Sequence, residues 1–204
     1  MKLYYAPGAC SLSPHIVLLE AGAKFDLAKV EFPSKKTSDG QDLLAINPKG
    51  SVPTLRLDDG DVLTEGAVIV QYIADQAGNK TLAPTAGTKE RLKVQEWLNY
   101  IASELHKGFS PLFNPATPDA YKTIVKSNLA KQFAYLEKSL AGKDYLTGKN
   151  FTVADAYLFT ILNWRHKLNI DISAYNNLTA YLDRVGARPK VKEAMQSEGL
   201  LKAA

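Results

Sequence analysis

Residues 1–32 read MKLYYAPGACSLSPHIVLLEAGAKFDLAKVEF. Lys2–Tyr5 has the residue types of a short strand, and the Pro-Gly pair that follows predicts a turn. A helix is expected to begin near Ser11 or Ser13, because serine is a preferred N-cap residue, and to end before the next glycine. Residues 25–32 alternate between apolar and polar, which predicts a second strand. The stretch is therefore interpreted as a strand–helix–strand unit, whose crossover should be right-handed.

The chain continues this pattern as far as residue 77. It adds a short helix, two short strands and a last helix, expected at 41–46, 54–58, 61–63 and 65–77. The Asp59-Gly60 pair between the two strands is a strong hairpin signal. The order βαβ, α, ββα is that of a thioredoxin-like domain, so residues 1–77 are expected to form an α/β domain of this kind.

The chain changes character after this point. Residues 78–88 are rich in residues that break regular structure, lack periodicity, and are interpreted as a linker. Every periodic segment that follows predicts a helix, at 89–109, 118–140, 153–168, 176–187 and 189–197. Thr152 and Asp155 form a capping-box pattern at the start of the third of these helices. Residues 89–204 are therefore expected to form an all-helical domain.

The composition is that of an ordinary globular protein: the chain has 204 residues, 46% of them hydrophobic and 23% charged, and a net charge of +4. No run of Lys or Arg exceeds two residues, so nucleic acid is not an expected partner. No apolar stretch approaches the roughly 18 residues of a membrane helix or forms the core of a signal peptide. A membrane is therefore not an expected partner, and the cytoplasm is the expected location. No pair of histidines has metal-ligand spacing, and no metal is expected.

Cys10 is the single cysteine of the chain. A single cysteine excludes an internal disulfide, a Cys-rich zinc site and a Cys-x-x-Cys redox pair. Because Cys10 follows a turn and stands at the start of the first helix, the helix amides are expected to stabilise its thiolate. The alternative is an inert buried thiol. If the thiol is reactive, any disulfide that it forms must be with another molecule.

Three further places along the chain are candidates for binding a peptide-like ligand. Val52-Pro53 precedes a strand, and in a thioredoxin-like domain a cis proline here presents the backbone of the preceding residue to a ligand that pairs like an added strand. Glu65 and Gly66 begin the last helix of this domain, where free amides bind a carboxylate and the glutamate can pair with an ammonium group. A glutamate favoured by the helix dipole is the alternative. Lys35, in a loop, either meets a terminal carboxylate or is simply solvated.

The helix expected at 89–109 has two faces. With about 100° of rotation per residue, an apolar stripe faces the core and consists of Val94, Trp97, Leu98, Ile101 and Leu105. Asn99, Ser103 and His106 lie on the opposite side, with Glu104 between the two stripes. This polar face is either solvated or lines a cleft or a partner subunit, and a histidine there can hydrogen-bond a thiolate or a carboxylate.

Five blocks of the sequence carry a family resemblance: MKLYYAPGACSLSPHI, NPKGSVPTLRLDDG, LTEGAVIVQYIAD, EWLNYIASELHKGFSPLF and FTVADAYLF. Together they resemble a glutathione S-transferase, and closely the bacterial beta class, over essentially the whole chain. The resemblance implies a thioredoxin-like N-terminal domain, an all-helical C-terminal domain and a homodimer. It also implies that glutathione binds between the two domains as a co-substrate.

The resemblance further implies a role for each matching residue. Glutathione binding is implied for Cys10, Lys35, Val52, Glu65, Gly66, Asn99, Ser103, Glu104 and His106, some of which can serve the neighbouring subunit of a dimer. Cys10 and His106 are the implied catalytic residues. The chain departs from the wider family at Gly66, where serine is common. A hydroxyl contact to the γ-glutamyl carboxylate is then missing, so weaker binding of glutathione is expected.

Three functions are compatible with these residues. The first is a transferase that conjugates the glutathione thiolate to a small hydrophobic electrophile, expected near Phe109–Phe113 and Trp164. The second is a glutathione-dependent thiol–disulfide oxidoreductase, in which Cys10 forms a mixed disulfide with glutathione. The third is a non-catalytic binding or regulatory protein with the same fold. The presence of Cys10 and Glu65 favours an enzyme, since a pure scaffold needs neither. Detoxification, catabolism and redox defence are all compatible roles.

Overall fold

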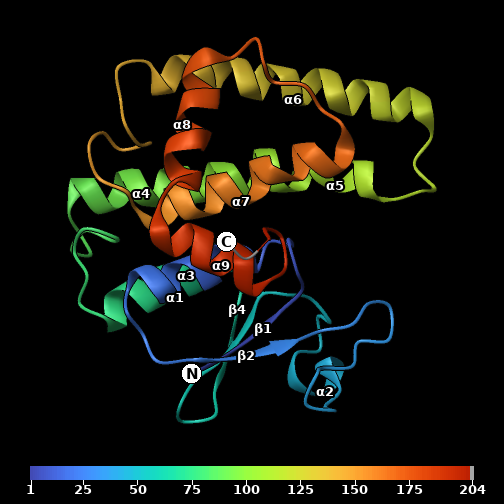
Figure 1. The fold of residues 1–204 in the computed structure, drawn as a ribbon, viewed down its shortest axis with the longest axis vertical. Helices are drawn as coiled ribbons and strands as arrows, with labels where there is room; N and C mark the ends of the chain where they lie inside the picture. The colour runs from blue at the N-terminus through green and yellow to red at the C-terminus, as the bar shows by residue number, and fades with distance from the viewer. Residues whose placement is uncertain (203–204) are drawn as a thin grey trace.

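The computed structural model describes residues 1–202 and consists of a four-stranded sheet with its helices, joined to a larger array of helices (Figure 1). The strands lie in the order β2-β1-β3-β4, and they are β1 (Lys2–Tyr5), β2 (Asp26–Lys29), β3 (Thr54–Arg56) and β4 (Val62–Thr64). β1 pairs in parallel with β2 and antiparallel with β3, and β3 pairs antiparallel with β4. The predicted strand–helix–strand unit and hairpin are both confirmed. β1 has the predicted bounds, β2 and β3 are shorter than predicted, and β4 is shifted by one residue.

Three helices accompany the sheet: α1 (Leu12–Glu20), α2 (Leu43–Ile46) and α3 (Gly66–Gln76). Alternation along β1 separates the two faces of the sheet, because successive side chains of a strand point to opposite sides. Leu3 and Tyr5 join the main core, which includes the apolar residues of α1 and α3. Tyr4 belongs to a smaller cluster with Leu43 of α2. The sheet is therefore covered on both faces.

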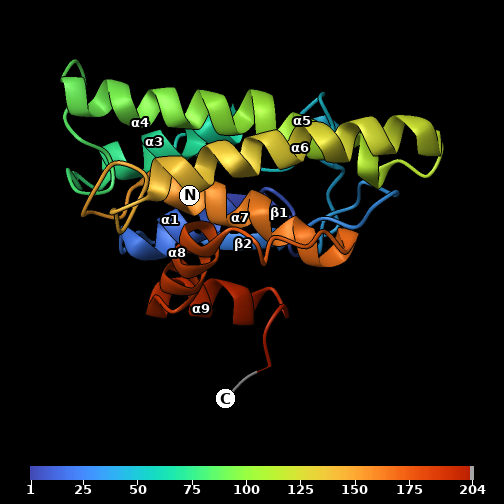
Figure 2. The same ribbon diagram turned by 90° about the horizontal axis from the view of Figure 1, so that it is seen from above.

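The rest of the described chain is helical, as predicted, and a linker joins it to α3. Its helical segments are α4 (Lys89–Tyr100), η1 (Ile101–His106), α5 (Lys107–Phe113), α6 (Asp119–Leu140), α7 (Val153–Leu168), α8 (Asn176–Gly186) and α9 (Pro189–Ser197). Viewed from above, α4 lies on the side of the molecule opposite α9 (Figure 2). The predicted domain limits, 1–77, 78–88 and 89–204, stay predictions, and residues 203 and 204 lie outside the described residues.

The helix predicted at 89–109 differs from the prediction in one respect. It continues to Phe113, and its middle section, η1, is a π-helix. The hydrogen bonds of a π-helix span one more residue than those of an α-helix, so the α-helical spacing of side chains does not hold through η1. Most of the predicted apolar stripe is nevertheless fully buried, and only Trp97 is half-buried.

α7 is the centre of the molecule. Every residue from Val153 to Leu162 is buried. α1 and α3 from the N-terminal part, and α4, η1 and α8 from the helical part, lie against it. Despite this apolar core, no helix within residues 1–202 combines the length and the hydropathy that crossing a membrane requires.

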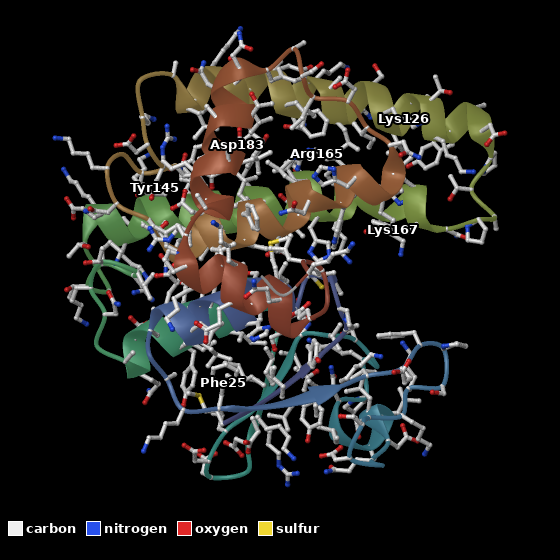
Figure 3. All side chains as sticks on the ribbon, in the orientation of Figure 1. Phe25, Lys126, Tyr145, Arg165, Lys167 and Asp183 are labelled. Atoms are coloured by element: carbon white, nitrogen blue, oxygen red, sulfur yellow. The ribbon has the colours of Figure 1, made fainter. Side chains whose placement is uncertain are left out.

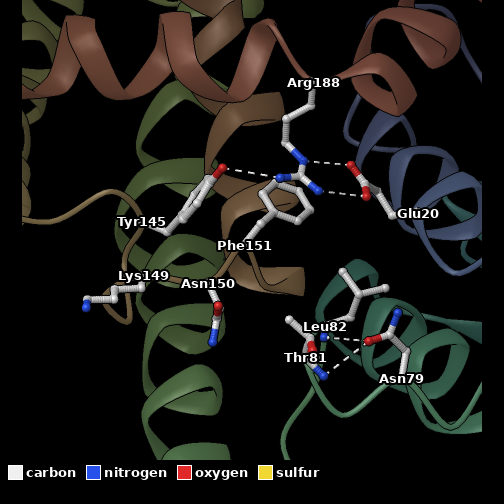
Figure 4. A pocket seen from close by; sticks show the side chains of 9 residues that line it. All are labelled: Glu20, Asn79, Thr81, Leu82, Tyr145, Lys149, Asn150, Phe151 and Arg188. Atoms are coloured by element: carbon white, nitrogen blue, oxygen red, sulfur yellow. Dashed lines mark hydrogen bonds and ion pairs between the residues drawn. The ribbon is translucent and has the colours of Figure 1, made fainter.

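Two bidentate pairs between arginine and a carboxylate tie the helical part to the N-terminal part. Arg91 of α4 donates to both carboxylate oxygens of Asp75, at 2.9 and 2.6 Å. Arg188, just before α9, donates to both oxygens of Glu20 at 2.7 and 2.9 Å, and its guanidinium lies 4.2 Å from the ring centre of Phe151 (Figure 4). Paired hydrogen bonds of this kind fix orientation as well as distance, so the two parts are held in one arrangement.

The N-terminus of α7 is organised by the buried carboxylate of Asp155. It accepts hydrogen bonds from the backbone N–H and the hydroxyl of Thr152, both at 2.8 Å. It also accepts from the backbone N–H of Leu146 at 2.9 Å and from the hydroxyl of Tyr181 at 3.0 Å. The predicted capping box is confirmed, and Asp155 additionally joins the start of α7 to the preceding loop and to α8.

Replacing Asp155 with alanine should lower the free energy of unfolding by about 3 kcal/mol, because four buried donors lose their acceptor. Urea denaturation at neutral pH measures the change. Thr152→Ala is the matched control and should cost about 1 kcal/mol, as the loss of a cap does. Equal losses for the two variants would contradict a role for Asp155 beyond capping.

Candidate active site

A cleft of about 940 Å³ lies between the two parts of the chain. Its N-terminal walls are the turn at residues 6–9, the loop around Lys35 and the segment 50–52. Its helical walls carry apolar side chains, including Phe113, Trp164, Met195, Leu200 and Leu201. Phe113 and Trp164, near which the second substrate is expected, line the cleft, whereas Phe109 is fully buried behind them.

The turn that precedes Cys10 is held by the helical part. The backbone N–H of Gly8 donates to Glu198 at 2.9 Å, and its carbonyl accepts from the indole N–H of Trp164 at 2.9 Å. Glu198 is buried and forms a second hydrogen bond, of 2.9 Å, with His15 of α1. Gly8 has a φ of +69°, and a Cβ there would lie 3.2 Å from Leu200. The positive φ favours glycine at this position.

The thiol of Cys10 lies against the segment that contains the cis proline. The Val52–Pro53 peptide bond is cis, which confirms that interpretation of the sequence. The Cys10 thiol donates to the Val52 carbonyl, with a sulfur–oxygen distance of 3.1 Å. The two residues that the sequence singled out separately, Cys10 and Val52, are thus in direct contact.

The prediction that Cys10 forms a stabilised thiolate is wrong. Burial raises the pKa of the Cys10 thiol to about 11, and this effect outweighs the opposing hydrogen bonds of the Cys10 and Ser11 backbone amides. The helix start is present, with Ser11 as the N-cap of α1. Loss of solvation disfavours the charged form of a thiol, so Cys10 is a protonated hydrogen-bond donor near neutral pH.

His106 lies at the end of η1 with its Nδ1 2.6 Å from the hydroxyl oxygen of Tyr157. Burial lowers the pKa of His106 to about 4, so the ring is neutral near pH 7. The buried hydroxyl hydrogen of Tyr157 needs an acceptor, which assigns Nδ1 as the acceptor and places the ring proton on Nε2. The ring packs edge-on against Trp164, with centroids 5.0 Å apart. His106 thus offers a neutral N–H donor beside a residue of the cleft.

Lys35 reaches the cleft, whereas Glu65 and Gly66 lie beside the cis proline. The Lys35 ammonium donates to the carbonyl of Gly50 at 2.8 Å. Glu65 has a φ of +71°, which is unusual for a residue other than glycine, and its exposed carboxylate pairs with Lys49 at 2.7 Å. Gly66 is the first residue of α3, and a Cβ built there would lie 3.6 Å from Pro53.

The predicted polar stripe of Asn99, Ser103 and His106 is not a single surface. Asn99 is exposed on α4, while Ser103 and its neighbour Glu104 line a separate cavity of about 350 Å³ between η1, α5 and α6. His106 instead faces Tyr157 and Trp164. The π-helical turn separates these side chains, because it changes the rotation between positions 101 and 106.

The sequence did not indicate two residues that position the site: Tyr157, which contacts His106, and Glu198, which contacts Gly8 and His15. Tyr157 was part of a helix that is apolar on nearly all sides, although a buried tyrosine usually places its hydroxyl on a partner. Glu198 follows α9 and contacts residues more than 180 positions away, for which no local pattern exists. Within residues 1–202, no group of three or more His, Cys, Asp or Glu is arranged to hold a metal ion.

Two neutral donors lie next to residues that line the apolar cleft, because Cys10 contacts Val52 and His106 contacts Trp164. Cys10 and His106 supply neutral donors, Val52 supplies backbone groups, and Lys35 supplies a positive charge. Such an arrangement can stabilise a thiolate brought by a ligand better than a thiolate of its own, because desolvation opposes ionisation of Cys10.

Comparisons with known proteins find similarity to glutathione S-transferases along nearly the whole chain. Two family models match, described as "Glutathione S-transferase, N-terminal domain" over residues 8–76 and "Glutathione S-transferase, C-terminal domain" over residues 100–189. Glutathione S-transferase GstA of Escherichia coli O157:H7 is 46% identical over 98% of this chain and 100% of its own length.

Solved structures of bacterial glutathione S-transferases are similar to this chain over 98% of its length. BphK, a bacterial glutathione S-transferase solved as a ternary complex, is 54% identical with a TM-score of 0.96, covering 98% of this chain and 100% of that one. A sphingomonad enzyme complexed with glutathione and the bacterial beta-class enzyme of Sphingomonas chungbukensis are 45% and 46% identical. Each has a TM-score of 0.95, with 98% of this chain and 100% of the other covered.

The raised pKa of Cys10 predicts slow alkylation near neutral pH. With a pKa of about 11, about one thiol in a few thousand is ionised at physiological pH. Alkylation is slow because only the thiolate reacts. The rate with iodoacetamide should therefore keep rising with pH up to about pH 10. The urea-unfolded chain is the control and should level off near the ordinary thiol pKa. A plateau below about pH 8 in the folded protein would contradict the assignment.

Proposed function

Because the chain belongs to the glutathione S-transferase family, we propose that it is a beta-class transferase that conjugates the glutathione thiolate to small hydrophobic electrophiles. Glutathione is the co-substrate. The observation that carries the proposal is the contact of the Cys10 thiol with the Val52 carbonyl, beside a cis proline and at the edge of a mainly apolar cleft.

The extended tripeptide is proposed to lie along the N-terminal wall of the cleft. Lys35 receives the glycyl carboxylate, because its ammonium is at the cleft and is bound to a carbonyl rather than to an acid. The backbone of Val52 pairs with the cysteinyl residue as an added strand would. Glu65 and the amide of Gly66 receive the γ-glutamyl ammonium and carboxylate at the start of α3.

Binding in this way releases the Cys10 thiol from the Val52 carbonyl, since the cysteinyl N–H of the ligand takes that acceptor. The glutathione thiol loses its proton to solvent, and its sulfur accepts hydrogen bonds from the Cys10 thiol and from Nε2–H of His106. Charge-assisted hydrogen bonds lower the pKa of the bound thiol and increase the fraction of nucleophile. With a chlorinated aromatic electrophile, a carbon–sulfur bond forms and chloride leaves with the electron pair of the carbon–chlorine bond.

A mixed disulfide of Cys10 is proposed as a second, slower reaction. The Cys10 thiolate attacks one sulfur of oxidised glutathione, a new disulfide forms, and the other half leaves as a thiolate. Cys10 lies where the glutathione sulfur is proposed to bind, which supports the reaction. Its raised pKa makes it slow near neutral pH.

A homodimer is proposed through the side of the molecule away from α9. In Figure 2, α4 lies on this side. Large apolar side chains are about half exposed on three helices: Val68 on α3, Leu92 on α4, and Tyr121 and Ile124 on α6. The cavity lined by Ser103 and Glu104 includes Tyr121. We therefore assign the proposed glutathione contacts of Asn99, Ser103 and Glu104 to this interface, where they can serve the neighbouring subunit.

Conjugation of chlorodinitrobenzene tests the main proposal. The wild type should form the glutathione conjugate, and Cys10→Ala should retain activity with kcat/KM about three- to tenfold lower, since a typical hydrogen bond contributes about 1 kcal/mol net. The pKa of bound glutathione, read from thiolate absorbance, should rise in the variant. No conjugation by the wild type would contradict the main proposal.

The mixed disulfide is tested with oxidised glutathione. Intact mass should show a reducible glutathione adduct in the wild type and none in Cys10→Ala.

Gly66→Ser should tighten glutathione binding. The φ of Gly66 is not in the left-handed region and a Cβ has ordinary contact with Pro53, so serine fits and its hydroxyl can donate to the γ-glutamyl carboxylate. The dissociation constant, measured by calorimetry, should fall about three- to tenfold, as expected for a hydrogen bond that contributes about 1 kcal/mol net. Gly66→Ala adds the Cβ without the hydroxyl and should bind like the wild type; equal tightening by both variants would refute the hydroxyl contact.

A further inference from the structure

The charges around the cleft are of one sign. Of the described residues that line it, none is Asp or Glu, while Lys35, His166 and Lys167 are basic. Lys35 is on the N-terminal wall, and the other two are at the C-terminal end of α7 on the helical wall. The second substrate must bind between these walls, so its site is apolar with a positive edge.

Lys167 provides the charge on the helical wall. It is exposed and forms no ion pair with any residue in 1–202. Figure 3 shows it at the end of α7, away from Asp183 of α8. His166 contributes little charge near pH 7, because burial and the neighbouring Arg165 lower its pKa. Lys167 is therefore a cation without a carboxylate partner at the rim of the cleft.

An aromatic surface connects Lys167 to the interior of the cleft. Its ammonium lies 5.7 Å from the ring centre of Phe113, and this ring packs edge-on against Trp164 with centroids 5.1 Å apart. An aromatic ring that packs on this surface would carry its outer substituent toward the ammonium. The apolar surface accepts neutral and anionic aromatic compounds alike, so Lys167 is what discriminates between them.

We propose that the preferred second substrate is an aromatic electrophile with an anionic substituent, such as a carboxylate, which Lys167 binds. This inference rests on the proposed conjugation. Lys35 is already assigned to the glycyl carboxylate of glutathione, so Lys167 is available for the second anion. The reaction is unchanged: the glutathione sulfur bonds to the activated ring carbon, and the halide leaves with its electron pair.

The experiment compares chlorodinitrobenzoate with its carboxamide, which has the same ring substitution and no charge. The measured quantity is the ratio of kcat/KM for the two electrophiles, each corrected for its uncatalysed rate. The wild-type ratio should favour the carboxylate about two- to fivefold, the range of a solvent-exposed ion pair. It should shrink at high salt, because exposed charges are screened.

Substitutions assign the preference to one residue. Lys167→Met should lower the ratio by about two- to fivefold, and Lys167→Arg should preserve it, because both cationic side chains bind a carboxylate. Lys126→Met is the matched control: it removes the same charge from an exposed lysine of α6 and should leave the ratio unchanged (Figure 3).

The outcomes separate the two proposals. Conjugation of neither electrophile by the wild type would overturn the proposed function itself. Conjugation of both, with a ratio that Lys167→Met does not change or that Lys126→Met changes equally, would overturn the role of Lys167 alone. Binding of the anionic conjugate, measured by calorimetry, should weaken by a similar factor in Lys167→Met and gives a readout independent of turnover.

Discussion

The peptide groups on either side of Gly8 are held by the helical part of the chain, and the arrangement of the site depends on this. One side is fixed by the buried Glu198 and the other by the indole of Trp164. The turn that carries Cys10 therefore belongs to the N-terminal fold by sequence but is positioned by α7 and the segment after α9. The same two elements supply a wall of the cleft, so the proposed sites of glutathione and of the electrophile share these elements.

Desolvation decides the chemistry of the two residues nearest the proposed sulfur. It raises the pKa of Cys10 and lowers that of His106, so both are neutral near pH 7. A neutral thiol and a neutral imidazole each keep a proton to donate, which suits them to stabilise an anion that arrives with a ligand. The helix amides near Cys10 do favour its thiolate, but by less than burial disfavours it.

Much of the fold could be predicted because its signals are local. The Pro-Gly turn, the Asp59-Gly60 hairpin and the capping box at Thr152 act within a few residues, and apolar periodicity marks the buried face of each element. The π-helical turn was not predictable in this way. Such turns are rare within helices and carry no simple residue pattern. On this one, His106 contacts Tyr157 while Ser103 lines another cavity.

The sequence by itself determined the order of the elements, the two-part architecture, the single thiol and the family that its blocks resemble. Only the tertiary structure decided that Cys10 touches Val52, that its thiol stays protonated, that His106 donates from Nε2, and that Lys167 stands without an acidic partner at the cleft. The reason is physical. Turns, caps and periodicity depend on residues that are neighbours in the sequence. Burial and many hydrogen bonds depend on residues far apart in the chain, such as His15 and Glu198.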